Sequence, residues 1–111
     1  MNERDFLHIS RIKTELAFAV DLLKNVSEEV FFTNEVLKHS ASMAFINIGE
    51  CIIRLSNEFK ENHPLVPWTK IIAVRNIAAH GYWELNMDQL WLYAMEDIPV
   101  LREVFNQYPD I

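Results

Sequence analysis

The stretch VLKHSASMAFINIGECIIRLSNEF, residues 36–59, decides the fold class of this chain. Its apolar side chains recur at steps of four and three residues: Leu37, Ala41, Phe45, Ile48, Ile52, Leu55 and Phe59. This spacing places them along one narrow seam of an α-helix, as in a coiled coil. We expect a long helix that starts after Ser27, whose hydroxyl can cap it, and ends near His63 and Pro64.

A second apolar face precedes this seam. Residues 3–25 carry apolar side chains at steps of three and four: Phe6, Ile9, Ile12, Leu16, Ala19 and Leu23. This period predicts another long helix, whose apolar face can pack against the seam of residues 36–59. The first half of the chain therefore predicts two long antiparallel helices.

Shorter helices are predicted after the seam. Pro67 can open a helix at its first turn, and we expect that helix to end at about His80. Asn86 can cap a fourth helix, and Pro99 allows a last short one to begin near Asp97. Since no alternating strand pattern competes, the sequence predicts an all-α bundle of two long helices and about three shorter ones.

The composition limits the classes of protein to which the chain can belong. Its 111 residues are 50% hydrophobic, which fits a single folded domain over residues 1–111 and excludes a disordered chain. The single cysteine, Cys51, excludes an intramolecular disulfide, and no apolar run is long enough for a signal or membrane-spanning segment. We therefore expect a cytoplasmic protein without a membrane partner.

Charge is unevenly distributed along the chain. The net charge is −6, yet residues 54–82 hold four basic and two acidic side chains and form the only net positive segment. This excludes a protein that binds nucleic acid by its global charge, but it permits a local basic site. The high apolar fraction of so short a chain favours self-association or a partner, with an unusually aromatic core as the alternative.

The segment VRNIAAHGY, residues 74–82, concentrates the groups that can do chemistry. Arg75 can neutralise phosphate, and His80 can move protons near neutral pH. Asn76 and His80 are four residues apart and share one helix face, whereas Arg75 points elsewhere around the axis. The alternative reading is structural: His80 caps the helix end, and Arg75 pairs with a carboxylate such as Glu50.

At these residues the chain resembles a known family. Arg75 to Tyr82 resembles the R-x4-H-x-Y signature of HepT-like proteins in the HEPN superfamily. The resemblance covers roughly residues 28–105, through further segments in matching order: Ile48-Gly49-Glu50, Arg54-Leu55-Ser56, His63-Pro64, Val66-Pro67-Trp68, Trp91 and Asp97-Ile98-Pro99-Val100-Leu101. It implies a HEPN-type helical bundle of five helices that forms a homodimer and brings two R-x4-H motifs into one cleft.

The resemblance also implies a function. Such proteins are toxins of toxin–antitoxin pairs, and the active members are metal-independent endoribonucleases that need no cofactor. Arg75 would hold the scissile phosphate of an RNA substrate, His80 would serve as general base or acid, and Asn76 would orient these groups. The partner would be a minimal nucleotidyltransferase antitoxin that transfers AMP to the motif tyrosine, Tyr82.

Several other side chains could support the site or could have purely structural roles. We expect Glu50 to support Arg75, because a carboxylate within an apolar stretch needs a partner. Arg54 either adds to a basic cleft or forms an ion pair, and Trp83 either lines the cleft or packs structurally. Cys51 reads as a small core residue, and the remaining histidines show no metal-ligand spacing. Two other functions stay open: a non-catalytic helical adaptor that binds a nucleotidyltransferase, and a purely structural dimerisation bundle.

Overall fold

A computed structural model describes residues 2–80, 87–109 and 111, except for the side chain of His80. Within these residues every regular element is helical, as predicted. The elements follow one another as α1 Glu3–Leu23, α2 Glu28–Thr33, α3 Glu35–Arg54, α4 Asn57–Glu61, α5 Trp68–His80, α6 Met87–Leu92, a π-helical turn Tyr93–Asp97, and α7 Ile98–Phe105. None of the described helices is both long enough and apolar enough to cross a membrane.

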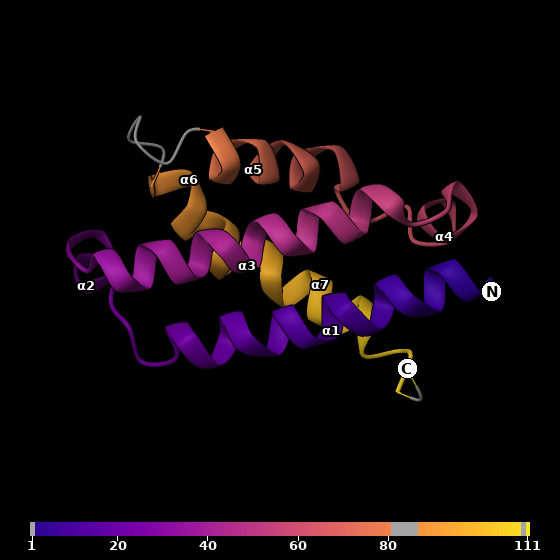
Figure 1. The fold of residues 1–111 in the computed structure, drawn as a ribbon, viewed down its shortest axis with the longest axis horizontal. Coiled ribbons are helices and arrows are strands. Elements are labelled where there is room, and N and C mark those ends of the chain that lie inside the picture. The colour runs from indigo at the N-terminus through magenta and orange to yellow at the C-terminus, as the bar shows by residue number, and fades with distance from the viewer. Residues whose placement is uncertain (1, 81–86, 110) are drawn as a thin grey trace.

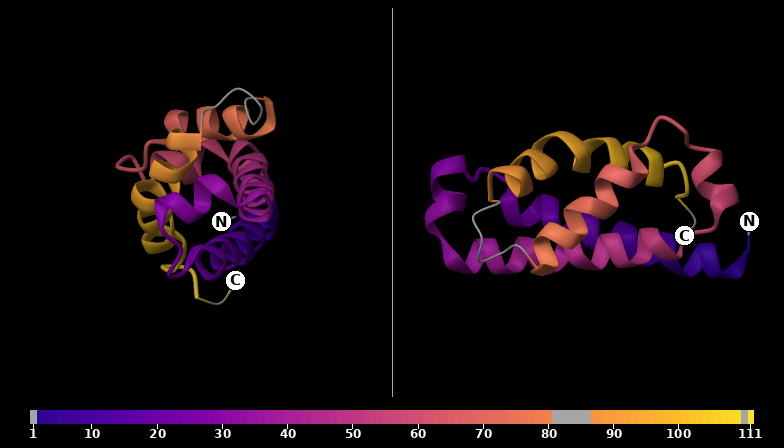
Figure 2. Two further views of the ribbon diagram at one scale, coloured as in Figure 1. Left: turned by 90° about the vertical axis from the view of Figure 1, so that its left-hand side faces the viewer. Right: turned by 90° about the horizontal axis from the view of Figure 1, so that it is seen from above.

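The helices pack around α3. Helices α1 and α3 run antiparallel along the long axis of the molecule, and α5 crosses α3 on the side opposite α1 (Figure 1). Helix α7 lies behind the layer of α1 and α3 (Figure 2), and α1, α3, α5 and α7 all contribute buried side chains to one core. The seam supplies much of that core, with Phe45, Ile48 and Ile52 at most 1% exposed. The molecule measures 42 × 25 × 21 Å.

The single long helix expected from residue 27 to residue 63 is wrong, because the chain forms α2, α3 and α4 there. Asn34 separates the first two helices, and its side-chain oxygen accepts from the backbone N–H of Leu37 at 3.0 Å. Ser56 separates the last two, and its hydroxyl oxygen accepts from the N–H of Phe59 at 3.1 Å. Both residues are favourable N-caps, so they satisfy new helix starts within an unbroken apolar rhythm.

A buried carboxylate fixes the second of these breaks. Asp5 of α1 is 3% exposed, and it accepts from the backbone N–H of Ser56 at 2.8 Å and from its hydroxyl at 2.6 Å. The first of these hydrogen bonds satisfies a backbone donor that a continuous helix would have satisfied itself. The start of α4 is thus tied to the first turn of α1.

The remaining helix predictions agree with the structure. The expected helix over residues 3–25 is α1, the helix opened by Pro67 is α5, and the last short helix is α7, which carries Pro99 in its first turn. Helix α6 begins at Met87, although its predicted cap, Asn86, lies outside the described residues. The π-helical turn before α7 was not predicted.

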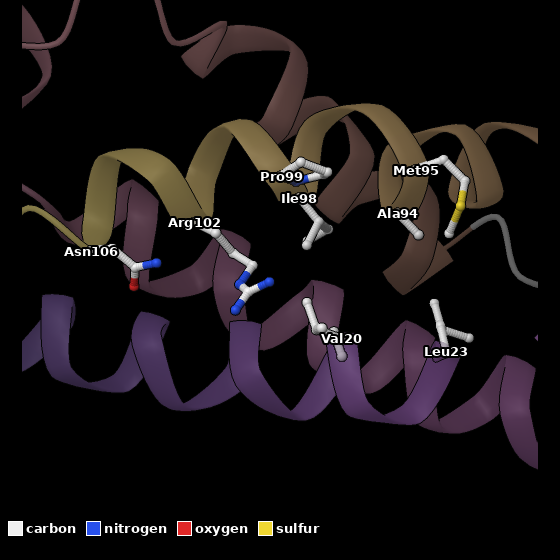
Figure 3. A pocket seen from close by; sticks show the side chains of 9 residues that line it. Val20, Leu23, Ala94, Met95, Ile98, Pro99, Arg102 and Asn106 are labelled. Carbon is white, nitrogen blue, oxygen red and sulfur yellow. The ribbon is translucent and has the colours of Figure 1, made fainter. Parts of the chain in front are cut away.

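Helices α1 and α7 leave a groove of about 430 Å³ between them (Figure 3). Val20 and Leu23 line it from α1, and Ile98 and Arg102 line it from α7. The side chain of Arg102 extends from α7 toward α1 in this groove (Figure 3). None of its lining residues belongs to the site described below.

Candidate functional site

An ion pair between α5 and α3 forms the centre of the candidate site. The Nε of Arg75 donates to Oε1 of Glu50 at 2.7 Å, and one terminal guanidinium nitrogen donates to the same oxygen. The other terminal nitrogen donates to the side-chain oxygen of Asn76 at 2.7 Å. The guanidinium is therefore held on two sides, which fixes both its place and its plane.

A glycine lets the two helices approach at this point. Gly49 lies on α3 directly beneath Arg75, and a Cβ atom at position 49 would overlap the Cβ and Cγ atoms of that arginine. The missing side chain thus allows the aliphatic part of Arg75 to rest on the α3 backbone. The guanidinium then reaches Glu50, the next residue along α3.

Glu50 also binds a second arginine. Arg54, one turn later on α3, donates from one terminal nitrogen to Oε2 of Glu50 at 2.9 Å and to the Glu50 carbonyl at 3.0 Å. The hydrogen bonds from Arg75 and then from Arg54 hold the pKa of Glu50 below its ordinary value. At neutral pH one carboxylate therefore stands between two cations, and the cluster keeps a net positive charge.

The cluster is open to solvent on one side. The side chains of Arg75, Glu50 and Arg54 are 25%, 31% and 50% exposed, and Asn76 is exposed. An anion arriving from solvent can therefore reach both guanidinium groups, which keep N–H donors that Glu50 does not use. Chemically, the arrangement suits the binding of a phosphate group and the neutralisation of charge that develops on it.

The structure brings together four of the residues that the sequence singled out: Glu50, Arg54, Arg75 and Asn76. Of these contacts, the sequence predicted only the one between Glu50 and Arg75. The functional roles of all four residues stay predictions. His80 is the last residue of α5, and its side chain is outside the described part of the chain. Tyr82 and Trp83 also lie outside the described residues.

Sequence reasoning gave no role to a polar groove beside the cluster. This groove between α1 and α3 is lined by His8 and Arg11 as well as by Glu50 and Arg54. The spacing of His8 and Arg11, three residues apart on α1, was a signal that both could reach one surface. It was missed because His8 was assessed only for metal-ligand spacing.

Other candidate groups have structural surroundings. Cys51 is 8% exposed, and burial raises the pKa of its thiol, as expected for a core residue. Trp68 donates its indole N–H to the carbonyls of Lys60 and His63, so it closes the turn before α5. In the described parts of the chain, no three His, Cys, Asp or Glu side chains converge as metal ligands would.

Comparison with known proteins gives the same family that the motif suggested. Residues 12–108 match the family described as ribonuclease HepT-like. A relative in Caldanaerobacter subterraneus subsp. tengcongensis, named a putative RNase, is 30% identical over 96 residues, which cover 86% of each chain. The protein named Probable ribonuclease HepT of Thermococcus cleftensis is 29% identical over 97 residues, or 84% of this chain and 88% of the relative. No solved structure is significantly similar. The chain belongs to the HepT-like ribonuclease family.

Proposed function

We propose that this protein is a metal-independent endoribonuclease, the toxin of a toxin–antitoxin pair, and that it works as a homodimer. The observation that carries the proposal is the fixed guanidinium of Arg75, held by Glu50 and Asn76 on the helix that ends at His80. The family match and the ribonuclease names of the relatives support RNA as the substrate.

The proposed reaction uses the ribose 2′-hydroxyl as nucleophile. Its oxygen attacks the adjacent phosphorus while a His80 imidazole accepts the hydroxyl proton. The bond from phosphorus to the 5′-oxygen breaks, and an imidazolium, supplied by the second His80 of the dimer, protonates that leaving oxygen. Arg75 stabilises the charge on the non-bridging oxygens, and the products are a 2′,3′-cyclic phosphate and a 5′-hydroxyl.

Glu50 and Asn76 would act through Arg75 in this reaction. Both accept hydrogen bonds from its guanidinium, so they set the position from which it meets the phosphate. A group fixed before the substrate arrives needs little reorganisation in the transition state. Glu50 is therefore a positioning residue, and Arg54 adds a second positive charge beside it.

The dimer and the antitoxin complete the proposal. A second copy would double the positive segment 54–82 within one cleft, and the apolar excess of the chain supports such an interface. The antitoxin would be a minimal nucleotidyltransferase. It would join the Tyr82 oxygen to the α-phosphate of ATP and release pyrophosphate. The added AMP phosphate would occupy the anion site beside Arg75 and repel RNA.

Cleavage of RNA by purified, unmodified protein in EDTA tests the function. We expect fragments that end in 2′,3′-cyclic phosphate from the wild-type protein and none from His80→Ala. Equal cleavage by both proteins would assign the activity to a contaminant. No cleavage by either would reject the ribonuclease.

One observation favours a second candidate, a non-catalytic adaptor that binds a nucleotidyltransferase. Arg75 and Glu50 satisfy each other across α3 and α5, as a purely structural ion pair would. The two candidates differ in cells. Only the toxin predicts growth arrest on expression that Arg75→Ala or His80→Ala relieves.

A further inference from the structure

The groove between α1 and α3 is a surface hollow that carries charged side chains. It encloses about 700 Å³, and its lining includes His8, Arg11 and Arg54. Helix α1 contributes the first two and α3 the third, so the antiparallel packing of these helices brings the three together.

Two arginines direct their charge at one place in this groove. Arg11 and Arg54 both line the groove together with His8 and Cys51, and the charges of both arginines act on the pKa of the His8 imidazole. Arg54 is engaged by Glu50, whereas Arg11 has no hydrogen bond or ion pair with any described residue. Arg11 thus offers an unused set of donors beside a cation that is already fixed.

His8 supplies a second, independent sign of a ligand. The residue is 6% exposed, it lines the groove, and its Nδ1 has no hydrogen-bond partner among the described residues. Burial, and then the charges of Arg11, Arg4 and Arg54, lower the pKa of this imidazole. A neutral, buried imidazole nitrogen without a partner is costly, so His8 has hydrogen-bonding capacity that no described residue uses.

The groove is continuous with the candidate site. Glu50 lines the groove and is the carboxylate that holds Arg75, so the two surfaces meet at this residue. The other carboxylate in the lining, Glu15, lies one turn after Arg11 on α1 and accepts from the side-chain amide of Asn47 at 3.3 Å. Arg54, which donates to Glu50, therefore lies at the part of the groove that adjoins Arg75.

We infer that this groove is a phosphate subsite that holds a neighbouring phosphodiester of the RNA strand cleaved beside Arg75. Arg11 and Arg54 would bind its non-bridging oxygens, and His8 would exchange a hydrogen bond with the phosphate or the adjoining ribose. The inference rests on the proposed ribonuclease function, since it extends the path of the same strand from α5 across α3 to α1.

The test measures binding of a 2′-O-methyl oligoribonucleotide, which lacks the nucleophile and cannot be cleaved. Fluorescence anisotropy at several salt concentrations gives both the affinity and the slope of log K against log salt. Arg11→Gln should weaken binding roughly tenfold and reduce the slope by about 0.7, the value for one lost contact to a single strand. Arg11→Lys keeps the charge and should keep the slope.

Arg102→Gln is the matched control, because Arg102 is an exposed arginine that lines the separate groove between α1 and α7 (Figure 3). Its affinity and slope should equal those of the wild-type protein. Circular dichroism confirms that each variant is folded. The imidazole resonances of His8 should also shift when the oligonucleotide is added.

The outcomes separate this inference from the proposed function. If the wild-type protein cleaves RNA but Arg11→Gln binds with the wild-type slope, the groove is not a phosphate subsite and the ribonuclease stands. If AMP or ATP shifts the His8 resonances and the oligonucleotide does not, the groove takes free nucleotides, which overturns the inference. If the slope depends on Arg11 but wild-type protein does not cleave RNA in EDTA, the subsite stands and the catalytic proposal fails.

Discussion

The backbone of Gly49 on α3 lies directly against the Cβ and Cγ atoms of Arg75 on α5. This contact sets how closely the two helices approach at the candidate site. It also places the guanidinium of Arg75 beside Glu50, the residue that follows the glycine. The position of the cation therefore depends on helix packing as much as on its own side-chain torsions.

Replacement of Gly49 by alanine should destabilise the protein. Alanine favours a helix interior over glycine by about 1 kcal/mol, but overlap in a packed interface costs about 1–3 kcal/mol. We expect the cost of overlap to exceed the gain in helix propensity. The overlapping atoms of Arg75 lie close to its backbone, so a change of side-chain torsion cannot move them out of the way. Urea unfolding measures the loss in unfolding free energy. Met43→Ala, at an exposed position on α3, is the control. A Gly49→Ala protein as stable as the wild type would contradict the close approach.

The ion pairs of Glu50 with Arg75 and Arg54 should make the free energy of unfolding depend on pH. The pKa of Glu50 is lowered in the folded protein, so its contribution is fully present above the ordinary value of 4.5. It is lost as the pH falls through the lowered pKa. The difference in unfolding free energy between wild type and Glu50→Gln should therefore shrink as unfolding is measured from pH 7 toward pH 3. A difference that stays constant would show that charge on Glu50 does not matter.

Lysine should not replace Arg75 in the proposed reaction. The arginine donates to Glu50 through Nε and a terminal nitrogen and to Asn76 through the other terminal nitrogen. An ammonium group is a single point and cannot keep this plane. We expect Arg75→Lys to lower kcat for RNA cleavage by about 100-fold while the protein stays folded. Activity near the wild-type level would mean that charge alone suffices.

The buried carboxylate of Asp5 should be important for stability. Asp5→Ala removes the acceptor of the backbone N–H and the hydroxyl of Ser56, at a cost of about 2 kcal/mol or more. Thermal or urea unfolding reports this loss. Asp21→Ala removes an exposed carboxylate from the same helix and should change stability little. Equal effects from the two substitutions would argue that the tie between α1 and α4 is unimportant.

Modification of Tyr82 has a direct test in intact mass. If the proposed nucleotidyltransferase antitoxin is encoded in a neighbouring reading frame, coexpression with it should add mass in steps of one AMP unit. These additions should disappear in Tyr82→Phe and remain in Tyr93→Phe, because Tyr93 is 1% exposed and sits in the core. Additions that persist in Tyr82→Phe would place the modification elsewhere.

Much of the fold could be predicted because the period of apolar residues is a local property. Residues 3–25 and the segment after Pro67 each carry a clear helical face, and both form helices. The breaks at Asn34 and Ser56 were harder, since both interrupt a seam whose rhythm continues through them. Their capping chemistry was visible, but Asp5, which fixes the second break, lies 51 residues away in the chain.

The candidate site also has one feature that a local sequence pattern predicts and others that depend on tertiary packing. The pairing of Arg75 with Glu50 was predictable, because a carboxylate in an apolar stretch needs a nearby cation. The approach of Arg75 to Gly49 and the presence of Arg11 and Arg54 in one groove depend on how α1, α3 and α5 pack. Such packing brings together residues that are far apart in sequence, so no local pattern reports it.

The close approach at Gly49 also bears on protein engineering. Grafting only the segment from Arg75 to Tyr82 onto another scaffold would transfer the motif residues. It would not transfer the α3 backbone at Gly49, against which the arginine side chain packs. The smallest portable part is a helix pair, with glycine and glutamate side by side on one member and arginine on the other.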